Sequence, residues 1–192
     1  METKAAIASS LFVVAVTSLT GALLHARARR VDVRVGLIFG AAGMAGAFLG
    51  GRLAALIPAQ VLMFAFASMM IATALAMLRG RRTDRPPGTL SPSKAVIDGL
   101  LVGVVTGLVG AGGGFLVVPA LVLFGGLSME RAIGTSLLVI ALKSFAGVAG
   151  HLGHVAIDWQ LVAPVTGVAV LGSFVGVALA SRVSPATLRR GF

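Results

Sequence analysis

The chain has 192 residues, of which 57% are hydrophobic and only 11% are charged. A soluble domain carries about 25% charged residues, and a mean hydropathy of +1.02 is too high for a soluble globule of this size. These figures exclude a soluble enzyme and a disordered protein, and they predict an all-α, polytopic transmembrane helical bundle. Cysteine is absent, which excludes disulfides and Cys-based zinc sites.

The net charge of +10 comes from short basic clusters that lie between apolar runs, at 27–34, 79–94 and 182–190. Charges that set membrane topology are distributed in this way. Aromatic residues are not interleaved with the clusters, so we expect no nucleic-acid partner. Contact with the anionic headgroups of the lipid bilayer explains the charge better.

Five apolar runs reach the length of about 20 residues that a spanning helix needs. They cover 5–24, 35–57, 59–78, 131–150 and 159–181. The one long polar stretch, 79–94, contains Pro-Pro-Gly and Ser-Pro steps and predicts a cytoplasmic linker. It separates a first half, 1–78, from a second half, 95–192.

The segment 95–126 is too long for one span and short for two. Its middle, 107–114, reads GLVGAGGG, and each glycine weakens a helix by about 1 kcal/mol relative to alanine. We therefore predict a glycine-broken membrane helix, with one piece over about 95–109 and another over about 115–126.

The chain repeats itself at an offset of 126, because 6–33 aligns with 132–159 without a gap. The rare pairs His25/His151 and Asp32/Asp158 are identical, and we expect both aspartates to cap the helices that follow them. The pattern predicts an internal duplication, which is common in transporters. At this offset the first half lacks a glycine-rich counterpart of 110–114, and the closing helix of the second half is truncated.

Two topologies are open for 95–126. If it crosses the membrane once, the basic clusters fall on both faces. If it dips in and returns, or crosses twice, nearly all Lys and Arg residues share one face, with Arg52 as the main exception. The positive-inside rule favours the second topology, in which the two halves form an inverted repeat.

The glycine run is the sharpest candidate for a substrate site, through Gly112, Gly113 and Gly114. Unwound backbone inside a membrane is tolerated only where protein buries it or water reaches it. The helix that follows would present free N–H groups and a positive dipole end, which suits an anion. The alternative is close helix packing, for which small residues are also used.

Polar side chains inside the spans are the other candidates. Thr135 and Ser136 align with Ser9 and Ser10, so two hydroxyl pairs could face one shared cavity, although intramembrane hydroxyls also bond to their own helix. Lys143 lies well inside 131–150, where an ionisable group is costly and indicates function. The alternative for Lys143 is snorkelling or a structural contact.

The sequence does not support a metal site or an enzymatic active site. His25, His151 and His154 lack the Glu or Cys neighbours of a zinc site, so we expect no metal and no cofactor. No Ser/His/Asp set, HExxH motif or carboxylate pair indicates a membrane hydrolase, so we expect no enzyme.

The segments GLVGAGGGFLVVPALVLFGGLS (107–128) and RAIGTSLLVIALKSFAGVAGHLGHVAIDW (131–159) resemble the TauE/SafE (TSUP) family of sulfite and organosulfonate exporters. The first-half segment 5–54, which is similar to the second half at the offset of 126, fits the same family. The resemblance implies a bacterial inner-membrane, multi-pass permease built from two related four-helix halves. It implies transport of small sulfur-containing anions such as sulfite or sulfoacetate. Family members carry the glycine-rich segment in both halves, whereas this chain has only the second copy.

We therefore expect a secondary transporter for small anions. The alternative is an inactive truncated fragment or a non-transporting helper subunit. The missing glycine-rich copy leaves three accounts open: a truncated gene product, a misplaced start codon, or a chain that completes itself by pairing with a second copy, as a homodimer.

Overall fold

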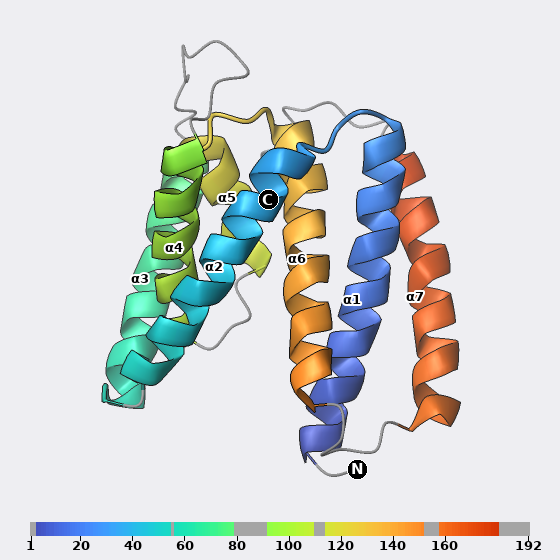
Figure 1. Cartoon of the computed structure of the whole chain (residues 1–192), viewed down its shortest axis with the longest axis horizontal. Coiled ribbons are helices and arrows are strands. Elements are labelled where there is room, and N and C mark those ends of the chain that lie inside the picture. Colours follow the sequence, from blue (N-terminus) through green and yellow to red (C-terminus); the bar gives the residue numbers. More distant parts are fainter. Residues whose placement is uncertain (1–2, 55, 79–91, 110–113, 152–157, 181–192) are drawn as a thin grey trace.

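The computed structural model describes residues 3–54, 56–78, 92–109, 114–151 and 158–180. Every regular element in these ranges is an α-helix, which confirms the predicted all-α class (Figure 1). The helices are α1 (Thr3–Arg27), α2 (Val33–Ala54), α3 (Ala59–Leu78), α4 (Pro92–Val109), α5 (Gly114–Leu123), α6 (Met129–His151) and α7 (Trp159–Ala180).

Four of these helices are long and apolar enough to cross a membrane, in the stretches Ala5–Arg27, Val33–Ala54, Met129–Gly150 and Trp159–Gly176. They correspond to four of the five predicted spans. The fifth, 59–78, forms the helix α3, whose described apolar stretch is the shorter Gln60–Leu75.

Aspartate caps start two of the helices, as predicted. The Asp32 carboxylate accepts a hydrogen bond from the backbone N–H of Val35 at 3.0 Å, in the first turn of α2. The Asp158 carboxylate accepts one from the N–H of Gln160 at 3.1 Å, in the first turn of α7. Each cap satisfies a donor that the first turn of a helix leaves without a partner.

The predicted break between two helix pieces separates α4 from α5. In Figure 1, α4 begins at the end of the molecule where α1 finishes and runs toward the opposite end, and α5 returns to the first end. Residues 110–113 lie outside the described part of the chain. This course agrees with the topology in which 95–126 enters and leaves on one face.

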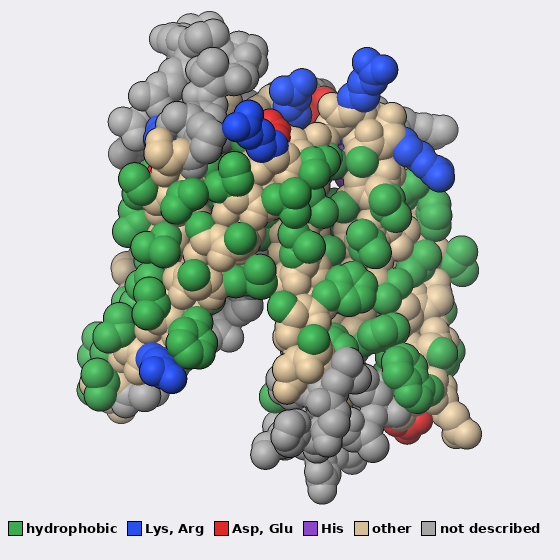
Figure 2. Space-filling model, viewed as in Figure 1, with side chains coloured by type: hydrophobic (Ala, Val, Ile, Leu, Met, Phe, Trp, Pro, Cys, Tyr) green, Lys and Arg blue, Asp and Glu red, His purple; other side chains and the backbone are tan. Residues whose placement is uncertain are grey.

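Most of the Lys and Arg side chains visible in Figure 2 gather at the end where α1 finishes and α2 begins. The cluster Arg27, Arg29, Arg30 and Arg34 lies there because it spans the turn between these two helices. Arg52, near the other end of α2, is the expected exception. The charge distribution therefore supports the same topology.

Glycine allows α2 and α4 to pack with their backbones in direct contact. A Cβ added at Gly46 would overlap the carbonyl oxygen of Leu100, and one at Gly103 would overlap that of Gly43. Gly50, against Val104, and Gly107, against Ala47, repeat these contacts one turn farther along. Small residues at four-residue spacing let transmembrane helices approach this closely.

The helices α1 and α6 pack in antiparallel fashion through two reciprocal contacts. The Cβ position of Gly21 lies 3.0 Å from Leu137, and that of Gly147 lies 3.1 Å from Leu11. Leu137 and Gly147 are the residues that align with Leu11 and Gly21 at the offset of 126. The helices α2 and α7 also begin and end 126 residues apart. These correspondences fit the duplication, which stays a prediction.

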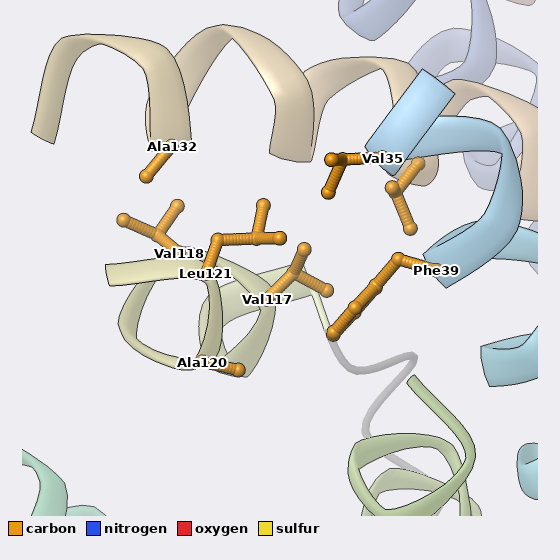
Figure 3. Close-up of a cluster of buried hydrophobic side chains, with 8 residues drawn as sticks. Val35, Phe39, Val117, Val118, Ala120, Leu121 and Ala132 are labelled. Atoms are coloured by element: carbon orange, nitrogen blue, oxygen red, sulfur yellow. The ribbon is translucent and has the colours of Figure 1, made fainter. Parts of the chain in front are cut away.

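A cluster of buried apolar side chains joins α2, α5 and α6 (Figure 3). Val35 and Phe39 come from α2 and pack against residues of α5, among them Val117, which is fully buried. Val139 of α6, also fully buried, completes this side of the cluster. The cluster holds the short helix α5 against two spanning helices.

Candidate functional site

Lys143 is the central polar group of the candidate site. Its Nζ is buried, and it has no hydrogen-bond partner among the described residues. The side chain extends from α6 toward α2, where the Cβ position of Gly43 lies 3.3 Å from Nζ. A larger residue at position 43 would occupy the space beside the amine.

Helical periodicity places Lys143 directly beyond the apolar cluster. On α6 it follows Val139 by one turn, and on α2 Gly43 follows Phe39 by one turn. The helix α5 runs in the opposite direction, so the residues one turn before Val117 lie at this same level. The amine of Lys143 therefore lies near the level at which α5 begins, at Gly114.

The start of α5 adds a second positive feature at this level. Gly114 is the first residue of the helix, whereas Gly112 and Gly113 lie outside the described residues. The first N–H groups of a helix have no partner within it, and its N-terminus carries a partial positive charge. An ammonium group and a helix N-terminus at one depth can attract an anion.

Thr135 and Ser136 are both buried, and each has a hydrogen-bond partner. The Thr135 hydroxyl oxygen accepts the backbone N–H of Asp32 at 3.0 Å, which ties α6 to the start of α2. The Ser136 hydroxyl donates to the carbonyl of Ile133 at 2.8 Å, within its own helix. The second contact is the self-bonding that the sequence left open as an alternative.

The two hydroxyl pairs do not lie together. Ser9 is buried with no hydrogen-bond partner in the described part of the chain, and Ser10 is exposed. Ser9 lies near the start of α1. Thr135 of α6 lies beside the end of α1, because the neighbouring residue Leu137 contacts Gly21. At 1.5 Å per residue, the two are roughly 20 Å apart along the helices. One shared cavity cannot include both.

A cavity of about 390 Å³ lies between α3, α4 and α5. Asp98 contributes a carboxylate oxygen that is buried without a partner among the described residues. The cavity is lined by Leu116 and Pro119 of α5, on the face of that helix away from Val117 and α6. Among the described residues that line it, nearly all are apolar and the one charged group is acidic, which does not suit an anion.

Sequence reasoning placed Asp98 only near the end of a span, and it did not single out Gly43. Asp98 is the only carboxylate within the segment 95–126, which singles it out, but no pattern reveals that it borders a cavity. Gly43 belongs to a glycine-rich helix, and only its contact with Lys143 distinguishes it from its neighbours.

The comparisons with known proteins agree with this architecture. The family described as Sulfite exporter TauE/SafE matches residues 1–192. The probable membrane transporter protein YdhB of Bacillus subtilis (strain 168) is 31% identical over 177 residues, which cover 89% of this chain and 72% of that protein. A probable membrane transporter protein of Xylella fastidiosa (strain 9a5c) is 32% identical over 184 residues, covering 93% and 70%.

An archaeal relative, from Methanocaldococcus jannaschii, is 26% identical over 201 residues, which cover 97% of this chain and 73% of that protein; it is also named a probable membrane transporter. No solved structure matches the chain significantly. The family and these relatives indicate a multi-pass membrane transporter, in agreement with four candidate spans. With a match over its whole length, the chain belongs to the TauE/SafE family.

Proposed function

We propose that the chain is a permease for small anions, and that sulfur oxyanions or organosulfonates of the sulfite and sulfoacetate type are its substrates. The family description supports this substrate class. We place the protein in the inner membrane of a bacterium, as a transporter without enzymatic activity.

The amine of Lys143, which is buried without a partner among the described residues, carries the proposal. An ammonium group buried without a partner is unfavourable, and such groups inside membrane proteins mark substrate or ion pathways. A bound anion would supply the missing hydrogen bonds and the opposite charge. Gly43 lets the amine lie directly against α2, since a larger side chain there would contact Nζ.

The start of α5 would orient the anion. Oxygen atoms of a sulfite or sulfonate accept hydrogen bonds, and the first N–H groups of a helix donate them. Glycine at 112–114 would let these oxygen atoms approach the backbone closely. Lys143 would then supply the positive charge, and the backbone N–H groups would orient the anion. In this scheme Thr135 holds α6 against the start of α2.

Flux measurements in proteoliposomes test the proposal. The unaltered chain, Lys143→Met and Arg52→Gln are reconstituted at equal density, and uptake of sulfite and of a sulfonate is followed. Lys143→Met keeps the side-chain length but removes the charge, so we expect at least a tenfold loss of flux. Arg52→Gln removes a positive charge that lies against the exposed ring of Phe48, away from the site, and we expect it to retain flux.

Equal flux through the unaltered chain and Lys143→Met would overturn the role of Lys143. Absence of anion flux from a folded, unaltered chain would favour the alternative function, a helper subunit that does not transport by itself. Flux of one anion class and not the other would identify the substrate.

A further inference from the structure

The carboxylate of Asp98, in α4, has no role in the proposed anion site. Its Oδ2 atom is buried and has no hydrogen-bond partner among the described residues. It borders the cavity between α3, α4 and α5, and the other described residues that line this cavity carry no charge. An ionisable group at such a place inside a membrane protein is costly and indicates a function.

Asp98 and Lys143 are close neighbours in the structure. The Cβ position of Gly43 lies 3.3 Å from the Nζ of Lys143 and 3.5 Å from the carbonyl oxygen of Gly99, the residue that follows Asp98. The amine therefore approaches α4 beside the turn that carries Asp98. Two groups of opposite charge thus lie near each other, and neither Nζ nor Oδ2 has a hydrogen-bond partner in the described structure.

Few other charged groups face Asp98. Lys94 lies one turn earlier on α4 itself. The helix α2 meets this turn of α4 through Phe39 and Ala42, which do not titrate. The helix α5 contains no titratable residue, and neither does the part of α3 that lines the cavity. Among the described residues, Lys143 of α6 is therefore the charge on the side of α4 toward the proposed anion site.

The position of Asp98 suits exchange of a proton with water at one face of the membrane. It lies six residues after Pro92, at which α4 begins, and this is roughly 9 Å along the helix. In Figure 1 the start of α4 lies at the end of the molecule where α1 finishes. The short helix α5 touches both sites, because Leu116 lines the cavity and Gly114 begins the helix near the level of Lys143.

Charge balance links the two groups. An ion in apolar surroundings is unfavourable unless an opposite charge compensates it. In the empty protein, the Asp98 carboxylate and the Lys143 ammonium compensate each other at short range. An anion bound at the amine takes over this role, and the carboxylate is then left as an excess negative charge nearby. A nearby negative charge favours the protonated form of a carboxyl group.

We propose that Asp98 takes up one proton from the aqueous phase when an anion binds at Lys143, so that the protein carries an anion and a proton together. The carboxylate becomes a neutral carboxylic acid, and the charge of the proton balances the charge of the anion. Transport of a monovalent anion is therefore electroneutral. Linkage requires that protonation of Asp98 strengthens anion binding by the same factor. This proposal rests on the proposed function and adds the ion that drives it.

Transport driven by a pH gradient tests the proposal. Proteoliposomes with an interior one pH unit more alkaline than the outside receive methanesulfonate, which stays fully ionised near neutral pH. With one proton per anion, we expect the unaltered chain to accumulate methanesulfonate about tenfold, because one pH unit is a tenfold difference in proton concentration. A pH-sensitive dye inside the vesicles should report one proton entering with each anion.

Three variants separate coupling from folding. Asp98→Asn cannot take up a proton, so we expect it to exchange labelled methanesulfonate without accumulating it, and to respond to an imposed membrane potential. Asp98→Glu restores a carboxyl group and should regain accumulation. Asp158→Asn is the matched control, because asparagine also caps a helix and this residue lies at the start of α7. It should accumulate methanesulfonate as the unaltered chain does.

The outcomes distinguish the proton site from the anion site. Methanesulfonate flux without accumulation in the unaltered chain, or equal accumulation by Asp98→Asn, overturns the proton site and leaves the anion site in place. Sulfite is followed in parallel, and for it the comparison with Asp98→Asn decides, since sulfite itself binds a proton near neutral pH. Absence of flux of both anions from a folded, unaltered chain overturns the proposed function and the proton site together. If Asp98→Asn does not fold, the ratio of protons to anions in the unaltered chain decides, and a ratio of zero overturns the proposal.

Discussion

At the scale of single residues, the polar side chains inside the membrane helices divide into two kinds. Thr135 and Ser136 have hydrogen-bond partners within the protein, so their hydroxyls stabilise the fold. Lys143 and Ser9 are buried without partners in the described structure. A buried polar group without a partner destabilises a fold by about 1–3 kcal/mol, and for an ionisable group inside a span, such as Lys143, this cost indicates a functional role.

We expect Lys143→Met to stabilise the fold while it removes transport. Methionine replaces the amine by an apolar group of similar length, which relieves a burial penalty of about 1–3 kcal/mol. Thermal unfolding in detergent should therefore show a higher Tm. A lower Tm would indicate that the amine makes a contact that stabilises the fold, and would argue against its being available to a ligand.

Thr135→Val should have the opposite effect on stability. Valine keeps the shape of the side chain, but it leaves the N–H of Asp32 without its acceptor. We expect a loss of about 1–3 kcal/mol in the free energy of unfolding. Thr166→Val, which removes only a hydrogen bond to the carbonyl of Val162 in its own helix, is the matched control and should change stability little.

At the scale of helices, glycine determines which elements pack closely. Gly103→Ala should destabilise the protein because its methyl group would overlap the backbone of Gly43. Overpacking of this kind costs about 1–3 kcal/mol and sometimes more. Gly167→Ala is the control, since its methyl group meets nothing within 4 Å. Denaturation of the two variants should separate them clearly, and equal stability would contradict the close packing of α2 and α4.

At the scale of the whole molecule, the course of α4 and α5 decides the topology. Ala28 lies between α1 and α2, Ser128 lies between α5 and α6, and both are exposed at the same end of the molecule. Leu56, between α2 and α3, is 81% exposed at the other end. We expect Ala28→Cys and Ser128→Cys to react with an impermeant reagent from the cytoplasmic face, and Leu56→Cys from the opposite face. Labelling of Ser128→Cys together with Leu56→Cys would refute this topology.

Much of the architecture could be predicted from the sequence. The thickness of a bilayer sets the length of an apolar run that can span it. The apolar runs of the sequence therefore predicted both the positions of the helices and the all-α class. Asp32 and Asp158 signalled their helix starts, because a cap depends on neighbouring residues alone. The glycine run located the break between α4 and α5, and Lys143 stood out because ionisable groups are rare inside spans.

The contacts between distant residues were decided only by the tertiary structure. Thr135 and Ser9 align in the sequence, yet an antiparallel helix pair puts them at opposite ends, and only Thr135 meets an N–H donor. Gly43 lies beside Lys143 because α2 packs against α6. The glycines of α2 contact α4 because these two helices pack with their backbones in contact. Local composition determines where a helix forms and how deep each residue lies in the membrane. Which side chains meet at that depth depends on packing between segments far apart in the chain.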